Sequence, residues 1–110
     1  MSRVLIEEIH SDVRKLLEVI LARLGHETVA LTHQRPHASE IDLLIVEPTS
    51  ARASELVRTL RRERPDLPIV AVSIAPRAGE WDQLELSGYL MKPFTISEIE
   101  GLISRCVSQG

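Results

Sequence analysis

Short apolar runs alternate along this chain with longer segments in which apolar residues recur every three or four positions. The clearest run, Leu43 to Val46, holds four aliphatic residues with no polar residue between them, which is typical of a parallel strand buried on both faces. The run stops at Glu47, because Pro48 cannot donate to a strand ladder. Ligands of open α/β sheets bind beyond the carboxyl ends of the strands, so Glu47 lies where a site is expected.

Other apolar runs also end next to polar groups. The first strand is predicted to run into Glu7 and Glu8. Two later strands end at the hydroxyl of Ser73 and just before Lys92. All of these groups are therefore expected near Glu47, at one edge of the sheet. The four additional predicted strands are Val4 to Ile6, Thr28 to Leu31, Ile69 to Ser73 and Gly88 to Met91.

The first of three predicted helices has the most regular apolar period. Ser11 or Asp12 is its predicted cap, and Gly25 is predicted to end it. The spacing of its apolar residues places them on one buried stripe. These residues are Val13, Leu16, Leu17, Ile20, Leu21 and Leu24.

Two further helices are predicted after Glu47 and after Lys92. Thr49 or Ser50 is the predicted cap of the second helix, and Thr95 or Ser97 that of the last. The second helix also carries five arginines, most of them near its C-terminus, where cations complement the helix dipole. We expect this face to be solvated; the alternative is a site for an anionic partner. The arginines are Arg52, Arg58, Arg61, Arg62 and Arg64.

Two other connections have little helical pattern. Residues 32–40 are polar and contain Pro36, which limits them to a turn or two of helix. His33 and His37 have the spacing of a metal-binding pair, but without a third nearby ligand they are expected to be solvated. Pro76 is predicted to open a short helix that carries Trp81 and Leu84. The alternation as a whole predicts an α/β fold, a doubly wound five-stranded parallel sheet in a single domain over residues 1–110.

Composition excludes several classes of protein. The net charge of −3 and the three aromatic residues give no basis for nucleic-acid binding. No apolar run reaches the roughly 18 residues of a membrane span, and the lone Cys106 fits a reducing compartment, so the cytoplasm is expected. No cofactor is expected, because no glycine-rich loop follows a strand and Glu8-Ile9-His10 lacks the downstream glycine of a corrin-ligating motif.

The polar residues at the strand ends, together with the run Ser-Gly-Tyr-Leu-Met-Lys-Pro-Phe at positions 87–94, resemble the receiver domain of bacterial response regulators. The resemblance covers the whole chain and implies the strand order 2-1-3-4-5. It also implies an acidic pair that holds Mg²⁺ and an aspartate that accepts a phosphoryl group from a histidine kinase. Ser73 and Lys92 match the contacts to the phosphoryl oxygens, and Tyr89 matches the aromatic that repacks on activation. Lys92-Pro93 matches the cis peptide bond of the family.

The departures from the family fall on its chemistry. Glu47 replaces the acceptor aspartate, and its extra methylene shifts the carboxylate by about 1.5 Å, which spoils an in-line geometry. Glu8 takes the first acidic position, but Ile9 takes the second and offers Mg²⁺ no oxygen. We therefore expect no bound metal and no phosphorylation. The alternative register makes Glu7 and Glu8 the pair that binds Mg²⁺, with Glu47 as a working acceptor.

The resemblance also indicates how the domain works. Three connections, 25–47, 47–73 and 73–92, are shorter than in an ordinary receiver, which predicts shortened helices on one face of the sheet. The preferred function is a phosphorylation-independent pseudo-receiver that signals by protein contact and is not an enzyme. The partner would be a kinase, an output domain or another signalling protein, with a homodimer also possible. The predicted contact face holds Trp81, Tyr89 and the last helix, unless Trp81 belongs to the core.

Overall fold

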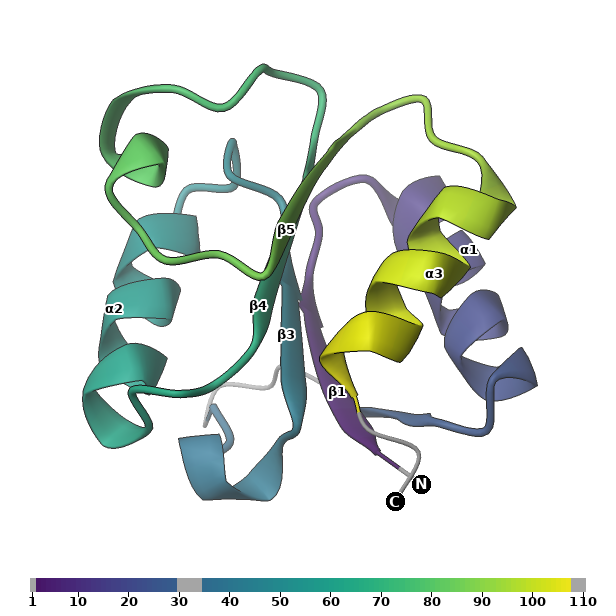
Figure 1. Cartoon of the computed structure of the whole chain (residues 1–110), viewed down its shortest axis with the longest axis horizontal. Helices are drawn as coiled ribbons and strands as arrows, with labels where there is room; N and C mark the ends of the chain where they lie inside the picture. Colours follow the sequence, from purple (N-terminus) through teal and green to yellow (C-terminus); the bar gives the residue numbers. More distant parts are fainter. Residues whose placement is uncertain (1, 30–34, 108–110) are drawn as a thin grey trace.

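The computed structural model describes residues 2–29 and 35–107, which form one parallel sheet with helices on both faces (Figure 1). The strand order is β2-β1-β3-β4-β5, and every neighbouring pair is parallel. The predicted fold class and strand order are therefore confirmed. The strands are β1 (Arg3–Glu7), β2 (Glu27–Val29), β3 (Leu43–Val46), β4 (Ile69–Ser73) and β5 (Gly88–Met91).

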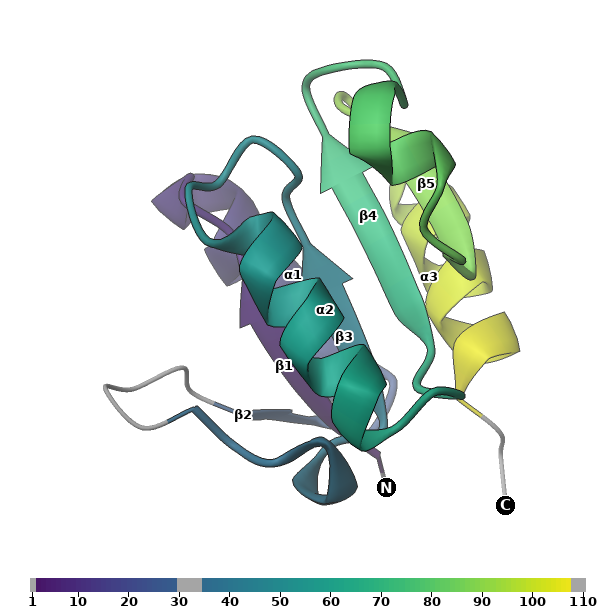
Figure 2. The same ribbon diagram turned by 90° about the vertical axis from the view of Figure 1, so that its left-hand side faces the viewer.

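Alternate residues of the central strand face different helices, which explains why β3 is apolar throughout. Leu43 and Ile45 pack with α1 (Ser11–Arg23) and α3 (Ile96–Cys106). Leu44 and Val46 pack on the opposite face with α2 (Ala53–Glu63), next to the short 3₁₀ turns η1 (Ala38–Glu40) and η2 (Gly79–Asp82). Figure 2 shows α2 lying across its face of the sheet. Within residues 2–29 and 35–107, α2 is the one α-helix that covers this face, as the short connections predicted.

Arginines hold the shortened connections on the α2 face. Arg61 donates from Nε to the carbonyl oxygen of Leu67 at 3.0 Å and also to the carbonyl oxygen of Glu85. Arg64 donates to the carbonyl oxygen of Ile41 at 2.8 Å. These two guanidinium groups thus satisfy three backbone carbonyl groups that lie outside the helices and strands. For both, the prediction of a purely solvated face is wrong, since they bind the chain itself.

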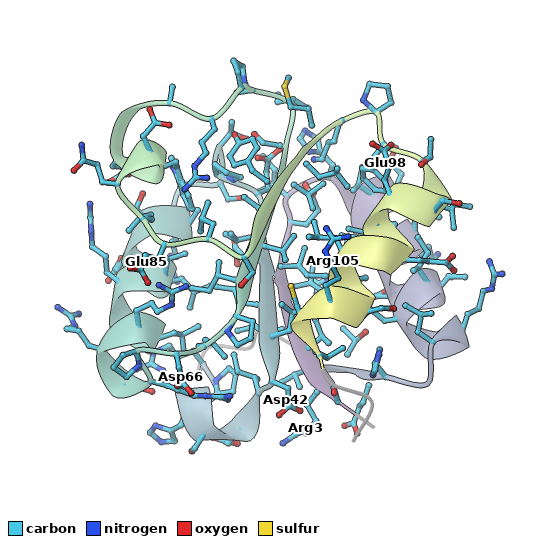
Figure 3. All side chains as sticks on the ribbon, in the orientation of Figure 1. Arg3, Asp42, Asp66, Glu85, Glu98 and Arg105 are labelled. Atoms are coloured by element: carbon cyan, nitrogen blue, oxygen red, sulfur yellow. The ribbon has the colours of Figure 1, made fainter. Side chains whose placement is uncertain are left out.

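The structure corrects several local predictions. His10 and Arg52 occupy the positions before α1 and α2, and neither makes a side-chain capping bond. The predicted N-terminal caps of the first two helices are therefore wrong, because none of these residues occupies the cap position: Ser11, Asp12, Thr49 and Ser50. The N-terminal cap of the last helix is as predicted, because the hydroxyl of Thr95 accepts a bond from the amide of Glu98 at 3.1 Å. Figure 3 labels Glu98 at the start of this helix. Gly25 also ends the first helix as predicted, with a positive φ of 85° directly after the C-cap Leu24.

Two further predictions change along the chain. Trp81 is 7% exposed and packs in the core on the α2 face, so the alternative made for this residue holds. The short helix expected from Pro76 is the 3₁₀ turn Gly79–Asp82 instead. The second strand is confirmed up to Val29, and its predicted end at Leu31 lies outside the described residues, as does His33.

Candidate functional site at the carboxyl edge of the sheet

Four strand ends bring polar side chains into a buried cluster. Glu8 follows β1, Glu47 follows β3, Ser73 ends β4 and Lys92 follows β5. Glu47 is 1% exposed, Ser73 is fully buried, and Glu8 is 7% exposed. Arg3 begins β1 at the opposite edge of the sheet, where Figure 3 labels it beside Asp42. The structure thus brings together the four residues that were predicted to meet at this edge, and they form one site: Glu8, Glu47, Ser73 and Lys92.

The ammonium group of Lys92 lies at the centre of this site. Its Nζ is 2.8 Å from Glu8 Oε1 and 3.1 Å from Glu47 Oε1. It is also 3.2 Å from Nδ1 of His10. The Lys92 side chain is only 10% exposed, so this cation is largely shielded from water. One buried ammonium therefore bridges two carboxylates and one imidazole.

Glu47 is held by several donors besides Lys92. Its Oε2 accepts from the amide of Thr49 at 3.2 Å, and its Oε1 accepts from the amide of Ile74 at 3.3 Å. Burial acts to raise the pKa of Glu47, but hydrogen bonds from Ser73, Thr49 and Lys92 outweigh it and hold the pKa below its usual value. Glu47 is therefore a carboxylate with little freedom to turn.

The loop after β4 is fixed by two side chains of the site. The hydroxyl of Ser73 accepts from the amide of Ala75 at 3.1 Å, and the hydroxyl of Tyr89 donates to the carbonyl oxygen of Ala75 at 2.7 Å. The Lys92-Pro93 peptide bond is cis. Tyr89 thus reaches the loop that follows Ser73.

Ile9 and Glu7 do not join this cluster. The Ile9 side chain offers no ligand atom, and the residue is 58% exposed. Among the described residues, one group of three could supply metal ligands, and it consists of Glu8, His10 and Glu47 without Glu7. The carbonyl oxygen of Glu7 accepts from the amide of Glu47 at 2.8 Å, which ties the two strand ends together through the backbone.

His10 is the site residue that the sequence analysis missed. It precedes α1 directly, and both its amide and its Nδ1 lie 3.0 Å from Glu8 Oε2. The signal in the sequence is the spacing Glu-x-His immediately after a strand end, at Glu8 and His10. A histidine at this position reaches the edge of the sheet because α1 starts one residue later.

Solved structures of signalling proteins share this architecture. The non-phosphorylated HemR receiver domain from Leptospira biflexa superposes with a TM-score of 0.81 at 20% identity, over 100% of this chain and 97% of that one. The fold is that of response regulator receiver domains. A CheY-like receiver domain protein from Methanospirillum hungatei gives a TM-score of 0.77 at 18% identity, over 96% and 92% of the two chains.

A third similar structure, of a response regulator protein, was solved with ligands. The response regulator TrrA from Thermotoga maritima, in complex with Mg²⁺ and BeF, gives a TM-score of 0.72 at 19% identity, over 97% of this chain and 100% of that chain. Comparison of the sequence with protein-family models gives no match, and neither does comparison with curated proteins. No helix in the described ranges is long and apolar enough to cross a membrane.

Proposed function

We propose that this chain is a receiver-like signalling module that acts by protein contact and does not use phosphorylation. The observation that supports this most strongly is the group of side chains at the strand ends, where Ile9 supplies no ligand atom and the ammonium of Lys92 lies between Glu8 and Glu47. A receiver that transfers phosphate needs a divalent cation close to these acids. Here a covalently attached cation takes up their charge instead.

The donor set does not fit Mg²⁺. This ion requires nearly octahedral oxygen ligands at about 2.0–2.1 Å. Glu8 and Glu47 supply carboxylates, but Ile9 supplies none, and the ammonium of Lys92 contacts the same two oxygens that the ion would need. We therefore derive no phosphoryl-transfer step through this site.

The surroundings of Glu47 also argue against its use as an acceptor. One oxygen accepts from Thr49, and the other accepts from Ile74 and Lys92. A carboxylate held at both oxygens must break these bonds to present an oxygen in line with a phosphodonor. The alternative, a working receiver that uses Glu7 and Glu8 for Mg²⁺, has less support because Glu7 lies outside the ligand grouping.

The proposed partner is a kinase, an output domain or another cytoplasmic signalling protein, and a second copy of the chain belongs to the same class of contact. The contact face is that of β5 and α3, where Met91 is 46% exposed and Ile96 is 45% exposed. Tyr89 is half-buried in this face. Trp81 cannot anchor a partner there, because its side chain is in the core.

Intact-mass measurement tests the absence of phosphorylation. The full chain is incubated with Mg²⁺ and acetyl phosphate, and the expected result is an unchanged mass. A gain of one phosphate on Glu47 would overturn the proposal. The variant Glu47→Gln serves as the control, since it keeps the shape of the side chain and removes the nucleophilic carboxylate.

A further inference from the structure

One side of α1 exposes apolar residues that the core does not use. The helix packs on the sheet through Leu17, Ile20 and Leu21, which are buried. Leu16 and Val19 belong to another side of the helix, since they are 39% and 53% exposed. Figure 1 shows α1 and α3 together as the layer that covers this face of the sheet. Packing on the sheet therefore does not explain why positions 16 and 19 are apolar.

Two charged residues continue this exposed side toward both ends of the helix. Asp12 lies in the first turn and Arg23 in the last turn, and both are exposed. The four positions are separated by four, three and four residues, the alternation that lines up side chains along a helix that pairs with another helix. We call this line the α1 stripe, and it consists of Asp12, Leu16, Val19 and Arg23.

The order of residues in the α1 stripe is complementary to itself. Its midpoint lies between residues 17 and 18, with one apolar residue on each side and opposite charges at equal distances further out. A two-fold axis through this midpoint, perpendicular to the helix, brings Leu16 opposite the partner's Val19. The same axis brings Asp12 opposite the partner's Arg23, and the symmetry makes this ion pair occur twice. A parallel pair of helices would instead set each charge against its own copy.

We propose that the α1 stripe binds a second copy of this chain, with the two α1 helices antiparallel. The helix has 13 residues, which gives about 20 Å of contact at a rise of about 1.5 Å per residue. The apolar residues at the centre are removed from water, and the charges at the ends fix the register and direction of the second helix. The stripe belongs to α1, whereas the contact face of the proposed function belongs to β5 and α3, so this inference does not rest on that function.

An adjoining groove enlarges the contact. Leu16 and Val13 line a groove of about 400 Å³, whose other lining residues include Pro93 and Phe94. The groove lies beside the N-terminal half of α1, where the C-terminal half of the partner's α1 lies in the antiparallel arrangement. All of its lining residues except Lys92 are apolar, so it can take up apolar side chains. A contact made by one helix and one groove is still small, and we expect a weak dimer that buries less than about 1,200 Å² in total.

Sedimentation equilibrium of the full chain tests the proposal. The average mass should rise from that of one chain toward that of two as the concentration is raised to about 1 mM. Val19→Ser should weaken the dimer by about tenfold, because each copy contributes this residue to the centre of the contact. Met91→Ser is the matched control: it removes an apolar residue of similar exposure, 46%, from the β5 and α3 face, and it should leave the dimer unchanged.

Charge reversal tests the antiparallel register. Asp12→Arg and Arg23→Asp each place like charges opposite one another at both ends of the contact, so each variant alone should dimerise at least about tenfold more weakly. An equal mixture of the two variants should recover dimerisation, because each copy supplies the charge that the other lacks. The chain that carries both reversals keeps the net charge and should dimerise like the wild type. Recovery requires folded chains, so a folding defect cannot imitate it.

Three results would overturn the α1 dimer. The first is a wild type that stays monomeric up to about 1 mM. The second is a dimer that Met91→Ser weakens and Val19→Ser does not, and the third is a lack of recovery in the chain with both charge reversals. The dimer and the proposed function fail separately, because the intact-mass assay reports phosphate on Glu47 and does not depend on the oligomeric state.

Discussion

Lys92→Met is the substitution for which the structure predicts the largest loss of stability at the site. Methionine keeps much of the length of the side chain and removes the charge. Glu8 and Glu47 are then left without their shared cation, and each is buried. Removal of one partner of a buried ion pair typically destabilises a protein by about 3–5 kcal/mol.

The amides of Thr49 and Ile74 keep their bonds to Glu47 in this variant, which reduces the loss. We therefore expect the free energy of unfolding to fall by about 3 kcal/mol, at the lower end of that range. For a domain of this size this corresponds to a fall of about 12 °C in melting temperature.

Urea unfolding at pH 7 measures this loss in a double-mutant cycle. The four proteins are the wild type, Lys92→Met, Glu47→Gln and the double variant. Neutralising Glu47 removes one of the two stranded charges, so the double variant should be more stable than the sum of the single losses predicts, by about 1 kcal/mol or more. Lys15→Met is the matched control: Lys15 is exposed on α1, and its loss should change stability by less than about 0.5 kcal/mol. Additive losses in the cycle would refute the contact between Lys92 and Glu47.

The remaining predictions concern magnesium binding, the packing and the response to acid. Ile9→Asp combined with Glu47→Asp should create weak Mg²⁺ binding, at about the millimolar level, seen as a melting temperature that rises with Mg²⁺; no rise in the double variant would mean that the short loops also prevent binding. Gly88→Ala should lower the free energy of unfolding, measured in urea, by about 1–3 kcal/mol. The reason is that the added Cβ would lie 2.5 Å from the side chain of Leu102, a buried leucine of α3. Gly101→Ala is the control, because its added Cβ has no contact closer than 3.8 Å, and it should be neutral or stabilising. A hydrogen bond from Arg35 holds the pKa of Glu63 at about 2, below its usual 4.5. The contribution of this ion pair to the free energy of unfolding is therefore complete above pH 4.5 and is lost as the pH falls toward 2. Glu63→Gln should flatten the dependence of stability on pH between 4.5 and 2, and an unchanged dependence would contradict the pairing.

The sheet and most of the site could be predicted from the sequence because each depends on local, strongly constrained patterns. An uninterrupted apolar run such as Leu43 to Val46 has few stable environments other than a central strand. In a parallel sheet the polar residues after such strands must then meet at one edge. This reasoning places Glu8, Glu47, Ser73 and Lys92 together without any knowledge of their distances.

Features that depend on contacts far apart in the sequence could not be predicted in the same way. His10 belongs to the site because α1 begins at Ser11, directly after it. The capping preferences of Ser11 and Asp12 predicted a helix that begins one or two residues later. The partners of Arg61 and Arg64 are backbone carbonyls at distant positions, and a carbonyl has no signature in the sequence. The same holds for Trp81, whose burial depends on how the short turn η2 packs against α2.

The arginine contacts on the α2 face have a consequence for which changes this protein tolerates. Arg61 donates a hydrogen bond to the backbone carbonyl oxygen of Glu85, and Glu85 itself is exposed. Every amino acid carries the same carbonyl, so the guanidinium group recognises the path of the loop and not its side chains. The identity of residue 85 is therefore open to substitution, whereas the position of its backbone is fixed by a residue 24 positions away.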